Sequence, residues 1–274
     1  MTYGIHLMVR HNCSTPRKNT TCSVRVPPRT PYLAFLLAVR YSAQMIVAPT
    51  IDPEKCARDL QLELWDRQCS LWPGELVTPL DVCDPWVAAH YLDFTVKEGQ
   101  LSSPTMRAGR ELGGFINRIG GVIAVSEQLS PRSKRFTLAH EVGHVVMHPG
   151  IHHHREIAMD GMTEPYEPAD PKERQANHFA GCFLVPAKQL RRAFNAAFGV
   201  ESLKLTDDVA FELLGANFTS LMNSAYDSPA FSRVVARAPR FRGRHFQPLH
   251  DLFQVSVTTM AIRLRQTGLV RSVG

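Results

Sequence analysis

The sequence predicts an α+β fold built from helices and a small β-sheet. Four segments begin with a helix-capping residue followed by proline, a pair typical of a helix N-terminus. We expect these helices over residues 53–69, 79–91, 131–148 and 171–184. Between the second and third helix, two apolar runs flank Gly120-Gly121, which predicts a β-hairpin with a two-residue turn. Because helices and strands are grouped rather than alternating, the order favours α+β over a βαβ architecture.

Composition places the 274-residue chain among globular proteins, with 44% hydrophobic and 20% charged residues. No apolar run approaches the roughly 20 residues that a membrane-spanning helix needs, which excludes an integral membrane protein. The net charge of +6 divides into +6 for residues 1–50, −7 for 51–229 and +7 for 230–274. The central body is therefore acidic, which speaks against nucleic acid as its partner.

Cysteine usage indicates a reducing compartment. No C-x-x-C pair occurs, which argues against a disulfide framework and against a thiolate metal cluster. The six scattered cysteines are Cys13, Cys22, Cys56, Cys69, Cys83 and Cys182. We therefore expect a cytoplasmic protein.

The chain divides into four regions. Residues 1–50, with six basic side chains and no acidic one, are read as a disordered extension or an early start codon, in which case Met45 would be the start. A targeting segment is the alternative. Residues 51–200 form the expected main domain, 201–246 a helical or linker insertion and 247–274 a closing helical element.

Two more helices are expected after Pro186, over residues 187–198 and 207–225. The arginine-rich stretch 233–244 that follows them is expected to be a solvated linker.

Residues 140–144 read H-E-x-x-H. Two histidines four residues apart project from one side of a helix and can hold one Zn²⁺, with the glutamate beside a water that the ion activates. Apart from that glutamate, residues 136–147 carry no Asp, Glu, Lys or Arg, so a single polar stripe crosses an apolar helix and indicates burial. A buried stripe must be hydrogen-bonded or metal-bound. The sequence thus predicts a hydrolytic zinc site with His140 and His144 as ligands; a surface helix is the alternative.

A catalytic zinc ion keeps three protein ligands and one open position. Glu173 is the best third candidate, because it precedes Ala176 on the apolar side of the 171–184 helix. The alternative, which stays open, is a capping box in which Glu173 bonds back to Asp170. His148 continues the polar stripe, yet three histidines at i+4 steps span about 12 Å of helix axis. We expect His148 to lie behind the ligands or to be structural.

Two blocks of the sequence resemble the ImmA/IrrE-type metallopeptidases. Residues 135–149 read R-F-T-L-A-H-E-V-G-H-V-V-M-H-P, and residues 173–186 read E-R-Q-A-N-H-F-A-G-C-F-L-V-P. The second block is similar to the family pattern E-x-x-A-N-x-F-A-x-x-L-L-x-P, whose leading glutamate is the third zinc ligand. The resemblance covers roughly residues 52–186 and resumes near the C-terminus.

The resemblance implies a zincin-like metallopeptidase core in which His140, His144 and Glu173 bind Zn²⁺ and Glu141 is the general base. It also implies a zinc-dependent endopeptidase of gluzincin type that cleaves a helix-turn-helix transcriptional repressor. Two other classes stay open: a DNA-binding regulator with a structural metal site, and a protein-binding antitoxin or immunity module. By analogy with zincins, the Gly120-Gly121 hairpin is expected to offer an edge strand to the substrate.

The closing segment, residues 249–270, is similar to the helix-turn-helix-like element that ends this family. It predicts a short helix, then a second helix with Ser256 as N-cap and Gly268 just past its end. DNA contact through Arg263 and Arg265 is one interpretation; we favour packing on the main domain, since two arginines give few phosphate contacts.

Two remaining features are a possible oxyanion-stabilising side chain and a run of three histidines. An oxyanion-stabilising residue is not identifiable, although Tyr166 and His178 are candidates. The run His152-His153-His154 could bind adventitious metal and is expected to lie in a solvated loop.

Overall fold

The computed structural model describes residues 51–101, 112–150, 153–157, 170–223 and 229–271. Residues 50–274 form one compact unit. The extension predicted at residues 1–50 lies outside the described residues. No helix within the described ranges is long and apolar enough to cross a bilayer.

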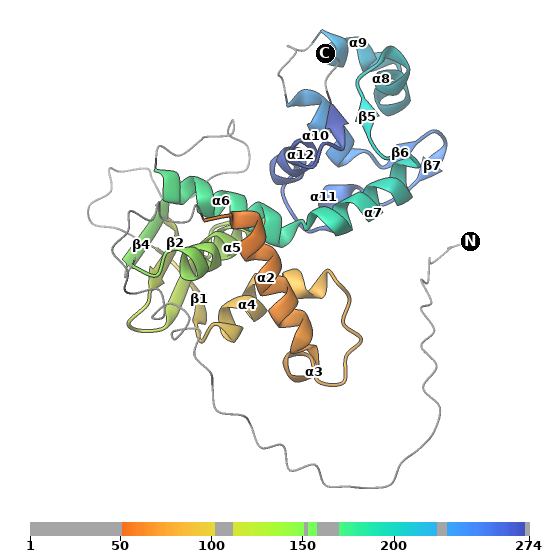
Figure 1. Ribbon diagram of the computed structural model, residues 1–274. Coiled ribbons are helices and arrows are strands. Elements are labelled where there is room, and N and C mark those ends of the chain that lie inside the picture. The colour runs from red at the N-terminus through yellow and green to blue at the C-terminus, as the bar shows by residue number, and fades with distance from the viewer. Residues whose placement is uncertain (1–50, 102–111, 151–152, 158–169, 224–228, 272–274) are drawn as a thin grey trace, which may run out of the picture. The chain divides into compact units, whose positions relative to one another are not determined.

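The N-terminal half holds a four-stranded sheet and its helices (Figure 1). The helices are α2 (Pro53–Asp66), α3 (Gln68–Leu71), the 3-10 turn η1 (Asp81–Cys83), α4 (Pro85–Tyr91), α5 (Pro131–Met147) and α6 (Pro171–Leu184). The strands are β1 (Thr95–Gly99), β2 (Leu112–Asn117), β3 (Val122–Ser126) and β4 (His153–Ile157). The mixed α+β class predicted from the sequence is therefore confirmed, with a helix-rich chain and a small sheet.

The C-terminal half is mostly helical. It contains α7 (Ala187–Phe198), β5 (Leu203–Lys204), α8 (Asp207–Leu214), η2 (Gly215–Asn217), α9 (Phe218–Met222), α10 (Ala230–Arg237), β6 (Arg240–Phe241), β7 (Arg244–His245), α11 (Leu249–Leu252), α12 (Val257–Gln266) and β8 (Val270–Arg271). Two small two-stranded sheets lie among these helices: β5 pairs with β8, and β6 pairs with β7.

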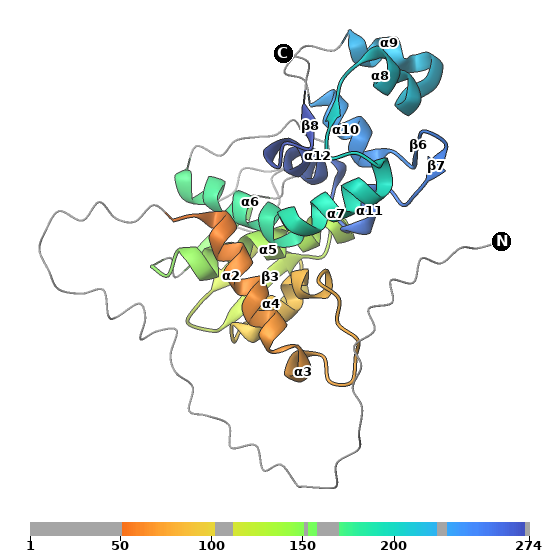
Figure 2. The same ribbon diagram turned by 45° about the vertical axis from the view of Figure 1, so that its right-hand side comes forward.

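Helix α5 occupies the centre of the N-terminal half. It packs against β2 and β3 on one side and against α6 and α2 on the other, as Figures 1 and 2 show. Ile116, Ile123 and Leu138 are fully buried where the sheet meets the helix. Helices α5 and α6 both begin at a proline that follows a capping residue. Ser130 accepts a hydrogen bond from Ser133 N–H at the start of α5, and Asp170 accepts one from Lys172 N–H at the start of α6.

The prediction of one helix over residues 79–91 is wrong for the N-terminal half of that segment. That part holds only η1, and the α-helix begins at Pro85, where Asp84 accepts hydrogen bonds from the N–H groups of Trp86 and Val87. A residue before proline is driven toward extended backbone, and Asp84 has ψ of 114°. Asp84-Pro85 is therefore the capping pair that matters, rather than Thr78-Pro79.

The predicted hairpin exists as β2 and β3, but its turn is longer than two residues. Asn117 pairs with Val122, so four residues form the loop, and the Asn117 side chain accepts a hydrogen bond from Gly120 N–H at 3.0 Å. Local amide pairing of this kind competes with the strand ladder and ends it early. Ile119 is consequently exposed at the tip.

The hairpin is not the edge of the sheet, contrary to expectation. The strand order is β1-β3-β2-β4, with β1 parallel to β3 and β4 antiparallel to β2. The edges are therefore β1 and β4. Strand β4 includes His153 and His154, so these two residues lie in a strand rather than in the expected loop.

The helix expected over residues 207–225 is interrupted at Gly215, whose backbone has φ of 59° and ψ of −135°. The stretch 233–244 is folded and not a solvated linker. Helix α10 buries Phe231, Val235 and Ala236, and Phe241 of the β6–β7 hairpin is 1% exposed. Apolar residues between the arginines account for this, because they alternate with the charges at helical and strand spacing.

The closing segment forms α11 and α12, with Ser256 capping α12 through Thr259 N–H and Gly268 at φ of 70° just after it. Arg263 of α12 is 1% exposed and donates from Nε to the carbonyl of Val185 at 3.2 Å. An ion pair between Arg132 and Asp251 joins α5 to α11. The buried guanidinium packs on the main domain and is not on the surface where DNA could reach it.

Candidate metal centre

Helix α5 presents His140, Glu141 and His144 to the interior, where they are 1%, 0% and 0% exposed. Helix α6 crosses close by, and a Cβ on Gly143 would lie 2.9 Å from Phe179 Cδ1. The absence of a side chain at this position therefore lets α6 approach the histidine-bearing turn of α5. Arg118 donates to the carbonyls of His144 and His148 at 2.6 and 3.1 Å, which satisfies the C-terminal end of α5.

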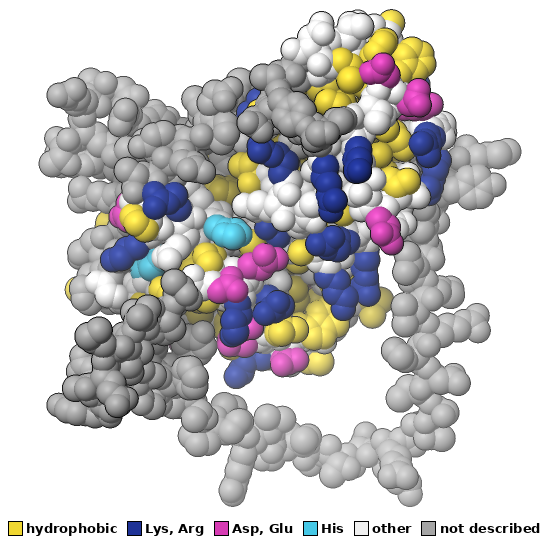
Figure 3. All heavy atoms as spheres, turned by 45° about the horizontal axis from the view of Figure 1, so that its top comes forward, with side chains coloured by type: hydrophobic (Ala, Val, Ile, Leu, Met, Phe, Trp, Pro, Cys, Tyr) yellow, Lys and Arg dark blue, Asp and Glu magenta, His cyan; other side chains and the backbone are white. Residues whose placement is uncertain are grey.

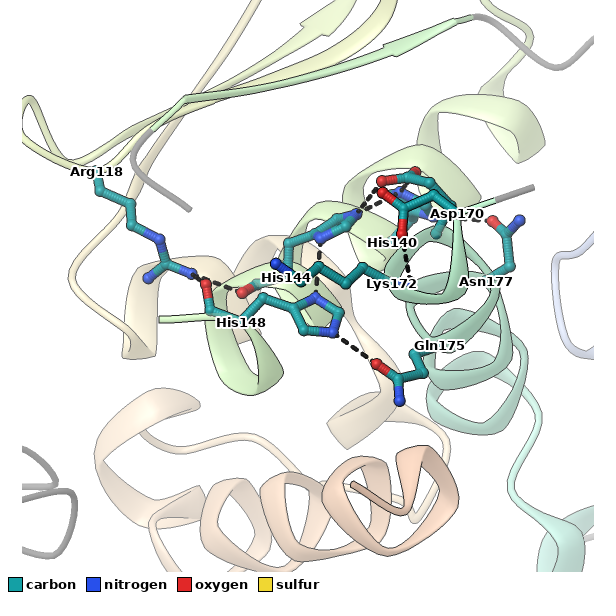
Figure 4. Close-up of polar contacts among 9 residues, drawn as sticks. Arg118, His140, His144, His148, Asp170, Lys172, Gln175 and Asn177 are labelled. Carbon is teal, nitrogen blue, oxygen red and sulfur yellow. Dashed lines mark hydrogen bonds and ion pairs between the residues drawn. The ribbon is translucent and has the colours of Figure 1, made fainter. Parts of the chain in front are cut away.

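The structure brings together the three residues predicted as ligands, His140, His144 and Glu173. Figure 4 shows the two histidines and their hydrogen-bonding partners. The Nε2 atoms of His140 and His144 lie 2.9 Å apart. Glu173 directs Oε2 to His140 Nε2 at 3.3 Å and Oε1 to His144 Nε2 at 3.4 Å. Both carboxylate oxygens of Glu173 therefore face the histidines, which is the orientation that a ligand needs.

The outward nitrogens of the two histidines are fixed by neighbours (Figure 4). His140 Nδ1 lies 2.8 Å from Asn177 Oδ1, an acceptor, so Nδ1 carries the proton. His148 Nε2 lies 2.9 Å from Gln175 Oε1, and its Nδ1 lies 3.0 Å from His144 Nδ1. His148 then donates to Gln175 and accepts from His144.

This pattern leaves a lone pair on the Nε2 atom of both His140 and His144. Two imidazole lone pairs and one carboxylate directed at a common point form the donor set that Zn²⁺ prefers, and outer partners of the ligating histidines are typical of such sites. The residues present thus fit a divalent cation. His148 contacts His144 at Nδ1, the ring nitrogen that faces away from Glu173, as the i+4 spacing of the histidines suggested.

Glu141 lies directly under strand β2. A Cβ on Gly114 would come within 2.5 Å of Glu141 Oε1 and 2.8 Å of Thr137 Cγ2. Only a glycine leaves room for the carboxylate there. Gly114 was missed in the sequence, although a glycine pair immediately before the apolar run at Phe115 is a signal for close approach within a strand.

A second group of metal-type side chains lies on another face of α6. Glu54, His178 and Cys182 have ligand atoms within 4.8 Å of one another. Burial raises the pKa of Cys182 to about 12. Burial also lowers the pKa of His178, and the Arg263 guanidinium lowers it further.

Arg263 distinguishes this second group, because its Nη2 lies 3.6 Å from Glu54 Oε1. The guanidinium already supplies the positive charge that the carboxylate attracts, so a metal ion would meet repulsion there. His178 belongs to this group and not to the one around His140. Tyr166, the other oxyanion candidate, lies outside the described residues.

The fold and the site define a candidate metallopeptidase domain, and comparison with known families names it. Residues 91–210 match the family model of the M78 peptidases, described as the IrrE N-terminal-like domain. This segment is a domain of that family, which confirms the resemblance to the ImmA/IrrE proteins. A comparison with curated proteins finds no match.

A domain of the M78 family suggests peptidase activity and a protein substrate. His140, His144 and Glu173 all lie within the matched segment and form a candidate metal site. Helix α2, which carries Glu54, and the elements from α9 to α12 lie outside it.

Proposed function

We propose that the protein is a zinc-dependent endopeptidase of gluzincin type. The observation that carries this proposal is the convergence of three side chains: the Nε2 atoms of His140 and His144 lie 3.3 and 3.4 Å from the two carboxylate oxygens of Glu173. His140, His144 and Glu173 would hold the ion. When bound, Zn²⁺ supplies Lewis-acid activation of water and of the scissile carbonyl.

Glu141 performs the proton transfers in this mechanism. Its carboxylate accepts a proton from the attacking water and returns it to the nitrogen of the leaving amine. Gly114 lies against the Glu141 carboxylate, and Glu141 has no exposed surface, so bulk water does not reach it. Asn177 and His148 keep the histidine rings oriented during turnover.

A substrate in extended conformation would add to an edge of the sheet. Strand β4 is the edge next to β2, which carries Gly114 over Glu141. Unpaired backbone groups at a sheet edge bind an extended peptide without reading much of its sequence. A helix-turn-helix repressor can supply such an extended segment from a linker or from a helix that opens transiently. Because such a repressor acts in the cytoplasm, we propose a cytoplasmic location for the protein.

The test compares the wild type with Glu141→Gln on the repressor encoded beside the gene. Glu141→Gln keeps the side-chain shape but removes the proton acceptor, so cleavage should fall by about 10² to 10⁴ while zinc and substrate binding remain. Glu127→Gln, an exposed residue outside the site, is the matched control and should cleave normally. A chelator should abolish wild-type cleavage.

Two outcomes would contradict the proposal. Equal repressor binding without cleavage by both proteins would identify an interaction module. Cleavage that survives Glu141→Gln at the wild-type rate would remove Glu141 from the mechanism.

A further inference from the structure

Two neighbouring elements of the C-terminal half are rich in basic residues and contain no acidic residue. Residues 187–199, which cover α7, and residues 238–248, which cover the β6–β7 hairpin, include no Asp or Glu. Their lysine and arginine side chains are all exposed: Lys188, Arg191, Arg192, Arg240, Arg242 and Arg244. We call these six residues the basic surface.

Side-chain and backbone contacts join the two elements into one unit. Helix α7 packs against both β6 and β7. The ring of Phe198 lies 5.4 Å from that of Phe241 and 5.0 Å from that of Phe246. Arg244 donates from Nη2 to the carbonyl of Ala196 at 2.9 Å. The aromatic cluster and this bond fix the hairpin against the helix, so the six cations are held on one rigid support.

The tip of the hairpin carries an unusual residue. Arg242 and Gly243 form its two-residue turn, with φ of 47° and 74°. Positive φ at both positions is what a type I′ turn requires, and asparagine or glycine normally fills the first of them. An arginine there is strained, and strain kept at an exposed tip points to a functional use of the side chain. The Arg242 guanidinium carbon lies 5.3 Å above the Phe241 ring, which helps to hold it.

We propose that the basic surface binds the phosphodiester backbone of duplex DNA. Guanidinium groups match phosphate geometry, and a narrow β-ribbon with arginine at its tip can follow a groove. The exposed large apolar residues of the described chain are Ile51, Leu62, Leu76, Ile119, Phe211 and Ile262, and none belongs to these elements. Helix α8, which packs against β6, adds the exposed acidic residues Asp207, Asp208 and Glu212. The six cations outnumber these three carboxylates, so the region keeps a positive balance that favours a polyanion.

This assignment differs from DNA contact through α12. Of the two arginines of α12, Arg263 is buried and only Arg265 is exposed. Figure 3 shows several lysine and arginine side chains, with a few acidic ones among them, over the right-hand part of the face in view. The binding would bring the peptidase to DNA-associated proteins, but it does not depend on peptidase activity. A failure of the proposed cleavage would leave the DNA test intact.

The experiment measures binding of the full-length, zinc-loaded protein to a fluorescent 30-base-pair duplex over a series of salt concentrations. The probe variant is Arg240→Gln with Arg242→Asn, which creates the favoured Asn-Gly turn and so should leave the melting temperature unchanged or higher. We expect its dissociation constant to rise about tenfold or more at low salt. The slope of log affinity against log salt should fall by about 1.8, or about 0.9 for each lost phosphate contact.

The matched control is Arg58→Gln with Lys97→Gln, two exposed cations on α2 and β1. It removes the same charge and should bind like the wild type. Unchanged binding by the probe variant, equal loss by the control, or no salt-dependent binding of the wild type would each overturn the proposal. So would equally tight binding to an acidic polyglutamate chain, because that would show charge attraction without recognition of phosphate.

Discussion

Helix α6 takes part in two side-chain clusters that look alike by residue type and differ in charge. On one face Glu173 meets His140 and His144, and on another His178 and Cys182 meet Glu54. In the first cluster the carboxylate faces two imidazole nitrogens. In the second it faces the guanidinium of Arg263, 3.6 Å away. Ligand-type residues in proximity are therefore not sufficient for a metal site, because the charge already present decides whether a cation is needed.

Burial and outer contacts separate the clusters further. The Glu173 side chain is 21% exposed, compared with 45% for Glu54. The outward nitrogens of His140 and His144 are bonded to Asn177 and His148. A preorganised and partly desolvated donor set binds a cation more tightly than a flexible exposed one. The comparison thus predicts one bound metal ion per chain.

The largest expected effect is the loss of metal. His140→Ala, His144→Ala and Glu173→Ala should each abolish stoichiometric zinc, because each removes one of the three proposed ligands. Elemental analysis of purified variants measures this. Full occupancy in Glu173→Ala would reduce that residue to a helix cap.

The second cluster supplies the controls for that experiment. His178→Ala and Cys182→Ser should keep one equivalent of zinc, since neither side chain belongs to the first cluster. Two equivalents of zinc in the wild type, falling to one in Cys182→Ser, would show that the second cluster also binds metal and would contradict the comparison.

The next effect concerns Glu141. Gly114→Ala would place a methyl group 2.5 Å from Glu141 Oε1 and displace the carboxylate. Because an error of about 1 Å in a catalytic group can cost roughly 10²-fold, peptidase turnover should fall by about that factor with zinc retained. Gly99→Ala is the matched control, since its added Cβ meets nothing within 4 Å. Normal turnover by Gly114→Ala would show that β2 does not position the base.

A smaller change in zinc affinity is expected from substitutions of His148 and Gln175, which contact the candidate ligand His144 directly or through one hydrogen bond. His148→Ala and Gln175→Ala interrupt the chain of hydrogen bonds that orients His144. Zinc affinity should fall about 10- to 100-fold, as for other outer partners, while saturating zinc restores full occupancy. Competition with a chromogenic chelator measures the affinity. Wild-type affinity in both variants would mean that packing alone orients His144.

The smallest effect tests Arg263 in the second cluster. Arg263→Met keeps the apolar stem against Gly181 but loses the hydrogen bonds to the Val185 carbonyl and to Gln266 Oε1, and the ion pair with Glu54. The free energy of unfolding should fall by about 1.5 kcal/mol, typical of a charged hydrogen bond, in denaturant titrations. Arg265→Met, at an exposed position on the same helix, should change stability by less than about 0.5 kcal/mol. An equal loss in the two variants would contradict a specific role for Arg263.

The sequence alone determined the features that depend on local chemistry. Helices α5 and α6 begin where Ser130 and Asp170 precede a proline, because a cap satisfies backbone groups only two or three residues away. The i+4 spacing placed His140 and His144 on one side of α5, since helical geometry is the same in every protein. The apolar side of α6 likewise oriented Glu173 toward the interior.

Only the tertiary structure decided which distant groups meet. Strands β1 and β4 carry no strong periodic signal of their own, and they pair because β2 and β3 offer them unpaired backbone groups. The same holds for Gly114 above Glu141 and for Arg263 beside Glu54, which are separated by many residues in the chain. Helix capping and periodicity act over a few residues, whereas strand order and contacts between elements depend on how the whole chain packs. For that reason the sequence predicted the ligands of the candidate site, and the fold supplied the groups that orient them.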